Sequence, residues 1–350
     1  MLAGKFSNLA TVPSDSPATR IAFGEAAGLR QRFDSIEQMA FAVRSLRPDR
    51  EWNASQLSRG TAAGRVIAFA GRDVSFTAGE ILGTVEVRGV VSPNSFVLGL
   101  GLPSLRGSRQ WRRPVECGMA LLMTPGEGHD GVYFEQSAYL AIDITQARLI
   151  AEGERMGLPL DPRELTTSRI LPGLVDRNWY GRVSAMIAGL HRGQAPQLPP
   201  GFHPGDMLFE GMLRHLVQGG ARGRALALPR SQTQSARIVA RARAVIDGGL
   251  DSPIRIDSLC EAAQCSRSVL YRAFENVLGE SPISYVLKLR LNRIRDDLAN
   301  PDEAMRTVSI VSARWGITEF GRLAGWYRAQ FGETPSETLR RRQPRLGRSA

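Results

Sequence analysis

The chain has 350 residues, of which 43% are apolar and 23% are charged, so it is long enough for two or three globular domains. No stretch approaches 18 consecutive apolar residues, which excludes an obvious membrane span, and residues 1–20 lack the pattern of a signal peptide. Three cysteines, Cys117, Cys260 and Cys265, are too few for a disulfide framework and favour a reducing cytoplasm.

The formal net charge is +11, and the basic excess is densest near the C-terminus. Residues 231–350 carry 19 Lys or Arg against 13 Asp or Glu, a balance of +6 in 120 residues. Such a balance favours a polyanionic partner such as nucleic acid. Because 43 of the 45 basic residues are arginine, a bias in genome composition explains the charge equally well.

The first 145 residues predict short β-strands separated by turns, because apolar runs alternate with Gly, Pro, Asn and Asp. This pattern is typical of an all-β barrel or sandwich. The clearest runs are RVIAFA (65–70), SFVLGLGL (95–102), CGMALLM (117–123) and AYLAIDI (138–144).

Helical periodicity follows, with apolar residues three and four apart in residues 145–157, 177–193 and 205–218. The stripes of the last two segments are larger than one barrel face needs, so we expect them to mediate dimerisation. The segment 219–235 is rich in Gly, Arg, Ser and Gln and predicts a linker.

A duplicated unit occupies the C-terminal region, where LGESP (278–282) and FGETP (331–335) lie 53 residues apart. With that offset, Leu270 aligns with Leu323 and Phe274 with Tyr327, so each copy has one apolar helix face. Gly279 and Gly332 are placed to end a helix in a left-handed conformation. Each copy therefore predicts a short helix, a tight turn and a longer helix, which is helix-turn-helix geometry.

Residues 235–342 resemble the DNA-binding domain of AraC/XylS-type transcriptional regulators. The resemblance depends on SLCEAAQCSRSVLYRAFENVLGESPISYVLKLRLNRIRDDL and WGITEFGRLAGWYRAQFGETPSETLRR. It implies an all-α double helix-turn-helix domain, preceded by a β-rich, cupin-like barrel with trailing helices that binds an effector and dimerises. The expected organisation is a sensor domain (1–165), a helical dimerisation region (166–220), a linker (221–234), the DNA-binding domain (235–342) and a basic tail (343–350).

Three positions depart from the family pattern. Gln264 occupies the first turn where glycine is common in the family, so either the backbone there is strained or the turn is altered. Ile317 replaces an aromatic residue after the second turn, and Gly325 replaces an arginine of the second recognition helix. The last departure predicts weaker base reading by the second motif.

The residues expected to touch DNA lie opposite the apolar faces of the two longer helices. Arginine can bond a guanine edge through two donors, whereas Ser, Thr and Tyr bond bases or phosphates. In the second copy, small residues replace most of these donors, and Glu319 can accept from cytosine but is repelled by phosphates. The expected DNA-binding residues are Arg267, Ser268, Tyr271, Arg272, Thr318, Glu319, Arg322 and Arg328.

The helix predicted between the two copies, residues 282–299, carries Lys288, Arg290, Arg293 and Arg295, which are expected to face outward. They are either phosphate contacts or a solvated face. The terminal run RRRQPRLGRSA (340–350) predicts a basic tail that attracts phosphates without specificity, unless it is merely a disordered end.

Sequence patterns for catalysis or metal binding were not found. The chain has no P-loop, G-x-S-x-G or H-E-x-x-H motif, and its histidines, His129, His191, His203 and His215, are isolated. We therefore expect no enzyme activity, no cofactor and no metal.

The predicted function is sequence-specific DNA binding by a homodimeric transcriptional regulator that responds to a small-molecule effector and contacts RNA polymerase. Two alternatives remain open: a ligandless dimeric regulator, and a cupin-like enzyme fused to a DNA-binding domain. A pocket could be lined by aromatic residues, although an ordinary core explains each of them: Trp52, Phe69, Trp111 and Tyr133.

Overall fold

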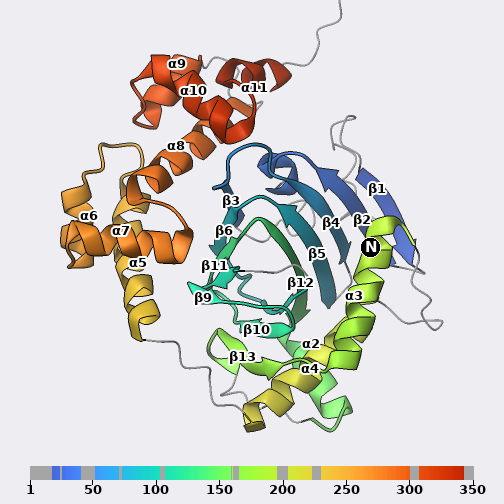
Figure 1. The fold of residues 1–350 in the computed structure, drawn as a ribbon. Helices are drawn as coiled ribbons and strands as arrows, with labels where there is room; N and C mark the ends of the chain where they lie inside the picture. Colours follow the sequence, from blue (N-terminus) through green and yellow to red (C-terminus); the bar gives the residue numbers. More distant parts are fainter. Residues whose placement is uncertain are drawn as a thin grey trace, which may run out of the picture. The chain divides into compact units, whose positions relative to one another are not determined.

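A computed structural model describes residues 18–23, 26–40, 52–70, 73–102, 107–158, 160, 165–194, 204–222, 230–299 and 307–342. The chain divides into two compact units. The N-terminal unit consists of Met1–Ala54 and Ala63–Ala227, and the C-terminal unit consists of Ser55–Ala62 and Leu228–Ala350. Figure 1 shows the helices and strands of both units.

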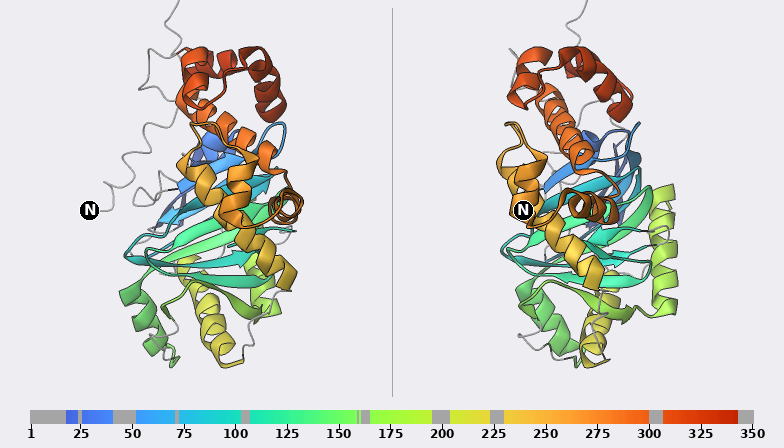
Figure 2. Two further views of the ribbon diagram at one scale, coloured as in Figure 1. Left: turned by 90° about the vertical axis from the view of Figure 1, so that its left-hand side faces the viewer. Right: turned by 60° about the vertical axis from the view of Figure 1, so that its left-hand side comes forward.

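The N-terminal unit contains two antiparallel sheets, which confirms the predicted β-rich domain (Figures 1 and 2). One sheet has eight strands in the order β1-β2-β4-β5-β12-β7-β10-β13, and the other has five in the order β3-β6-β11-β8-β9. The sheets do not close into a continuous barrel. The strands are β1 (Ala18–Phe23), β2 (Ala26–Phe33), β3 (Trp52–Gln56), β4 (Ala63–Ala70), β5 (Val74–Leu82), β6 (Val85–Val90), β7 (Ser95–Gly101), β8 (Arg109–Gln110), β9 (Arg113–Pro114), β10 (Met119–Met123), β11 (Gly128–Tyr133), β12 (Gln136–Thr145) and β13 (Arg169–Leu174).

Alternate residues of the central strands face different apolar clusters, as a side-chain period of two requires. In β7, Leu98 belongs to the larger core, whereas Val97 belongs to a smaller cluster on the opposite face. In β10, Leu122 likewise belongs to the larger core and Leu121 to the smaller cluster. The eight-stranded sheet is therefore covered on both faces, which explains why its strands read as nearly continuous apolar runs.

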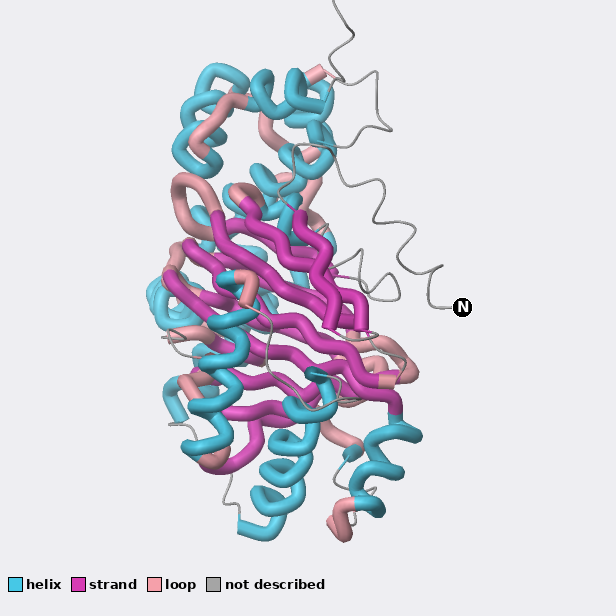
Figure 3. Tube along the Cα trace, turned by 90° about the vertical axis from the view of Figure 1, so that its right-hand side faces the viewer, coloured by secondary structure: helices cyan, strands magenta, loops and turns pink. Residues whose placement is uncertain are grey.

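Helices α2 (Gln146–Arg155), α3 (Arg177–Arg192) and α4 (Pro204–Arg222) follow the strands, close to the predicted ranges. Figure 3 shows helices lying against the larger sheet. The apolar stripes of α3 and α4 pack in the larger core, where Val183, Phe209 and Met212 are at most 1% exposed. These stripes are therefore used within the unit and, contrary to the expectation from the sequence, are not left over for dimerisation. Strand β13, which lies between the predicted helices, was also not expected.

The C-terminal unit is helical apart from residues 55–62, as predicted. Helix α8 lies between one group of helices, α5 to α7, and a second group, α9 to α11 (Figures 1 and 2). The helices are α5 (Arg230–Gly248), α6 (Ile256–Ala263), α7 (Arg267–Leu278), α8 (Pro282–Ala299), α9 (Val308–Arg314), α10 (Phe320–Phe331) and α11 (Pro335–Arg342). Helices α4 and α5 extend into the predicted linker, and residues 223–229 lie outside the described residues.

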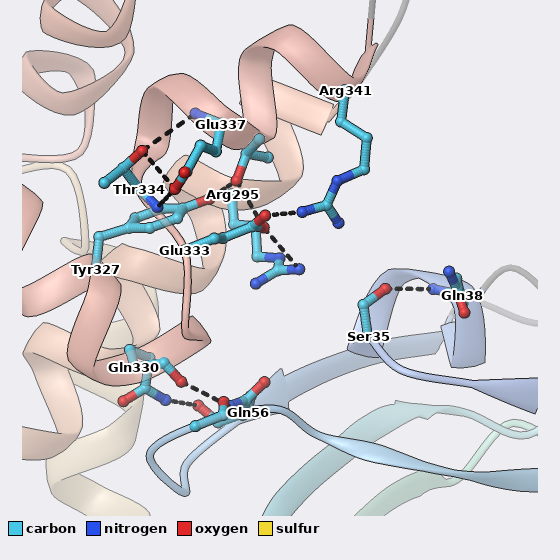
Figure 4. Close-up of polar contacts among 12 residues, drawn as sticks. Ser35, Gln38, Gln56, Arg295, Tyr327, Gln330, Glu333, Thr334, Glu337 and Arg341 are labelled. Atoms are coloured by element: carbon cyan, nitrogen blue, oxygen red, sulfur yellow. Dashed lines mark hydrogen bonds and ion pairs between the residues drawn. The ribbon is translucent and has the colours of Figure 1, made fainter.

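Within the C-terminal unit, buried amide groups hold the segment 55–62 against α8 and α10. Asn292 accepts the backbone N–H of Gln56 at 2.8 Å and donates to its carbonyl at 2.9 Å. The side chains of Gln56 and Gln330 each donate to the other's backbone carbonyl at 2.7 Å (Figure 4). The three amide side chains are at most 3% exposed, so they satisfy one another where water does not reach.

Candidate DNA interface

The first helix-turn-helix copy consists of α6, a turn and α7. Leu259, Ala263, Leu270 and Phe274 are at most 2% exposed and form its core, as the predicted apolar face requires. Gln264 ends α6 with φ 53° and ψ 50°, the left-handed conformation expected where the family commonly has glycine. A side chain in this conformation costs about 1 kcal/mol.

Replacing Gln264 by glycine should raise the free energy of unfolding by about 1 kcal/mol, because glycine adopts this conformation without steric conflict. The substitution removes one exposed hydrogen bond, from Arg241 Nη1 to Gln264 Oε1 at 3.0 Å, which is worth less than the strain. Urea unfolding of the full chain measures the change.

The matched control is Gly279→Ala, which places a side chain at φ 70° and should lower stability by a similar amount. A neutral or destabilising Gln264→Gly substitution would show that the turn is not strained.

The second copy consists of α9, a turn at Gly316 with φ 68°, and α10. Ile317, which stands where the family usually has an aromatic residue, is 4% exposed and packs with Leu323 and Tyr327. Glu319 occupies the N-cap position of α10 and forms an ion pair with Arg322 at 3.0 Å. The second motif therefore retains a complete apolar core despite its departure from the family pattern.

The glutamates of the two Gly-Glu-x-Pro segments form ion pairs with basic residues of α8. Gly279 and Gly332 end α7 and α10 in the left-handed conformation, as predicted. Glu280 then pairs with Lys288, and Glu333 pairs with Arg295 at 3.1 Å. Lys288 and Arg295 are seven residues apart and therefore share one face of α8.

The prediction that the basic residues of α8 face outward is wrong for most of them. Lys288 is 9% exposed and Arg295 is 5% exposed, and the Arg295 guanidinium also lies 4.5 Å from the centre of the Phe331 ring. Arg290 donates to the carbonyl of Leu250 at 3.0 Å. Arg293 is half-buried, and its Nη1 atom lies 3.9 Å from Asp296 Oδ2. Of the four residues, it comes nearest to the expected solvated position. Lys288, Arg290 and Arg295 therefore make contacts within the C-terminal unit and are not available as phosphate ligands.

The exposed face of α7 presents the strongest candidates for base contact. Arg267 and Arg272 are exposed, Ser268 is exposed beside Ser266, and Tyr271 is half-buried. Arg267 forms an ion pair with Asp257 through Nη2 at 2.6 Å, and this hydrogen bond raises the pKa of the guanidinium. Arg272 makes no hydrogen bond or ion pair with the residues that the structure describes, so its donors are available to a partner.

The exposed face of α10 offers fewer donors. Phe320, Gly321, Ala324 and Gly325 are exposed at the positions that match the polar residues of α7. Thr318, Glu319, Arg322 and Arg328 are exposed around them, with Arg322 already paired to Glu319. The predicted tail, residues 343–350, lies outside the described residues.

Helix α8, which separates the two copies, is similar in length to the spacing of the major groove of DNA. Helix α8 has 18 residues and spans about 27 Å at 1.5 Å per residue. Successive openings of the major groove on one side of DNA lie about 34 Å apart. With a motif at each end of α8, we expect α7 and α10 to lie at a separation of the same order as this groove spacing.

Sequence reasoning missed the segment 55–62 as part of this unit. Gln56 lies 236 residues from Asn292 in the sequence, and no local pattern connects them. Among the described residues there is no group of three or more His, Cys, Asp or Glu that could hold a metal ion. No helix within the described ranges is long and apolar enough to cross a membrane.

Comparison with known proteins supports the assignment of the C-terminal region. A family model for a helix-turn-helix domain matches residues 259–341. The "XylDLEGF operon transcriptional activator 3" of Pseudomonas putida is 38% identical over 98 residues, which cover 28% of this chain and 30% of that protein. The "Probable thc operon regulatory protein" of Rhodococcus erythropolis is 32% identical over 95 residues, which cover 27% and 29% of the two proteins.

A solved structure of a transcriptional regulator with an AraC-type DNA-binding domain, from Chromobacterium violaceum, is 26% identical with a TM-score of 0.29. It covers 33% of this chain and 99% of that chain. The chain spans about a third of the length of the curated relatives it matches. The repeat, its glycine stops, the family match and these relatives show that the C-terminal region is a helix-turn-helix DNA-binding domain of the AraC/XylS type.

Proposed function

We propose that this protein is a sequence-specific transcriptional regulator that inserts α7 and α10 into the major groove of promoter DNA. The observation that carries the proposal is the exposed basic face of α7, where Arg272 has no hydrogen bond or ion pair within the described ranges, on a motif whose other face is buried. The basic residues of α8 are used inside the unit, so the contact with DNA falls to the two recognition helices. The eight residues predicted to contact DNA are also part of this proposal.

The test is selection of binding sites by the full chain from a random pool of double-stranded DNA, followed by gel-shift titration. The full chain is used because residues 55–62 complete the C-terminal unit. We expect enrichment of one sequence and an affinity that falls steeply as salt is raised, since each phosphate contact releases counterions. A pool that stays random, or absence of binding at low salt, would contradict the proposal.

The proposal extends to partners that the relatives' names suggest. Several of them are named operon transcriptional activators, so we propose that this protein also activates an operon and contacts RNA polymerase in the cytoplasm. We further propose a homodimer, because dimers read two half-sites. No catalytic step belongs to the proposal.

Regulation by a small molecule is the last part of the proposal. A ligand controls such a protein only if it binds one conformation better than another. The N-terminal unit contains a cavity whose wall includes Arg109, a cation without an ion-pair partner among the described residues, which favours an effector-responsive regulator over a ligandless one.

A further inference from the structure

A cavity of about 60 Å³ lies in the N-terminal unit, several times the space that one water molecule needs. Its wall is mostly apolar, with Val97, Leu100 and Leu121 among the lining residues. The polar part of the wall includes Arg109, Gln110 and His129. The cavity can therefore hold a small molecule with an apolar body and one polar group.

Arg109 is the unusual member of this wall. Its Nε atom is buried without a hydrogen-bond partner, and its side chain forms no ion pair with the residues that the structure describes. Burial lowers the pKa of its guanidinium, although arginine remains protonated. Arg109 as a whole is half-buried, so its charge is partly desolvated, and a charge in such a position is normally paired. The neighbouring Arg112, in contrast, forms an ion pair with Asp130 at 3.4 Å.

The backbone that carries Arg109 is held in a strained turn. Trp111 and Arg112 form the two-residue turn between β8 and β9 with φ of 48° and 63°, where Asn and Gly are usual. The indole of Trp111 donates to the carbonyl of Gly128 at 2.7 Å, and its backbone N–H donates to the carbonyl of Asp130 at 2.7 Å. Strain of this kind persists only where the surrounding structure holds the backbone in place, and it is common at binding sites.

The rest of the wall suits a negative charge. Burial raises the pKa of Tyr133 and raises the pKa of Tyr139 to about 12, so both phenols stay neutral and able to donate. Gln110 lies 3.4 Å from His129 through Nε2 and Nδ1. The lining residues that the structure describes include no carboxylate. A cation and neutral donors on an apolar wall are complementary to an organic anion.

We infer that this cavity binds a small aliphatic monocarboxylate, with its carboxylate on Arg109 and its hydrocarbon part against Val97, Leu100 and Leu121. The inference that this acid is the effector rests on the proposed function, whereas the binding site itself does not. Inorganic phosphate lacks an apolar body and should bind weakly by comparison.

The test measures binding to the full chain by calorimetry, with butyrate, its uncharged isostere butyramide, and inorganic phosphate as probes. Butyrate should bind at least tenfold more tightly than butyramide or phosphate. Arg109→Gln should weaken butyrate binding by roughly 10-fold to 100-fold, the range for a hydrogen bond to a charged group. Arg113→Gln removes the same charge from an exposed position on the same hairpin and should leave binding unchanged.

A measurement of melting temperature distinguishes loss of the binding site from misfolding of the variant. Arg109→Gln removes a half-buried charge that has no ion-pair partner among the described residues, so without butyrate it should melt close to the temperature of the wild type. Arg109→Lys keeps the charge and should bind butyrate more tightly than Arg109→Gln. Equal binding of butyrate and butyramide, or equal losses in the Arg109→Gln and Arg113→Gln variants, would overturn the site.

DNA binding by the same samples separates the two proposals. We expect butyrate to change the affinity of the wild type for its selected DNA and not that of Arg109→Gln. Butyrate binding through Arg109 without any effect on DNA binding would overturn the effector role. Selective DNA binding by a protein whose butyrate affinity does not depend on Arg109 would overturn the site and leave the regulator intact.

Discussion

Replacing Glu333 by alanine should destabilise the C-terminal unit by about 3–5 kcal/mol, the cost of leaving one partner of a buried ion pair alone. Glu333 pairs with Arg295 at 3.1 Å, and the two side chains are 11% and 6% exposed. The same carboxylate accepts from the hydroxyl of Thr338 at 2.8 Å and pairs with Arg341 (Figure 4). Its removal leaves the Arg295 guanidinium buried without its carboxylate.

Hydrogen exchange of the full chain measures this effect, because the amides of α8 and α11 report the C-terminal unit separately. Glu319→Ala is the matched control: it removes a carboxylate from an ion pair whose side chains are 58% and 72% exposed, and should change stability little. The double substitution Arg295→Met with Glu333→Leu removes both charges and should recover much of the loss. Similar protection in the Glu333→Ala and Glu319→Ala variants would show that the pair does not hold α8 in place.

Replacing Arg272 by alanine should weaken binding to the selected DNA site roughly tenfold to a hundredfold and relax the preference at one base pair, as loss of a bidentate guanine contact does. Arg267→Ala should act in the same direction but less strongly. Arg267 is tied to Asp257 at 2.6 Å in the free protein, so its contact with DNA competes with an existing ion pair. Arg272 has no such competitor among the described residues.

Arg322→Ala is the comparison on the second recognition helix. Its neighbours Gly321, Ala324 and Gly325 have no side-chain donors, so Arg322 should serve as a phosphate contact. Its loss should weaken binding to all sequences evenly. The slope of the logarithm of the binding constant against the logarithm of salt concentration should fall by about one. Site selection with the three variants measures the difference. A changed consensus for Arg322→Ala, with an unchanged one for Arg272→Ala, would show that the second motif reads the bases.

The sequence alone determined the features of this protein that depend on local chain geometry. The 53-residue repeat, the glycines that end α7 and α10, and the two helix-turn-helix motifs were readable because helix period and left-handed stops are local properties. At Gln264, the resemblance to a family that commonly has glycine there left a strained backbone and an altered turn as alternatives, and the structure shows the left-handed backbone. The strands of the N-terminal unit followed from apolar runs and turn residues.

Only the tertiary structure decided how side chains distant in the sequence are used. A lysine or arginine on a helix is expected in solvent unless its partner is known, and the partners of Lys288 and Arg295 become evident only in the folded unit. An apolar stripe does not reveal which surface covers it, so those of α3 and α4 were assigned to a dimer although they pack in their own core. The amide contacts of Gln56, and the position of Arg109 in a cavity wall without an ion-pair partner among the described residues, depend on segments that meet only on folding.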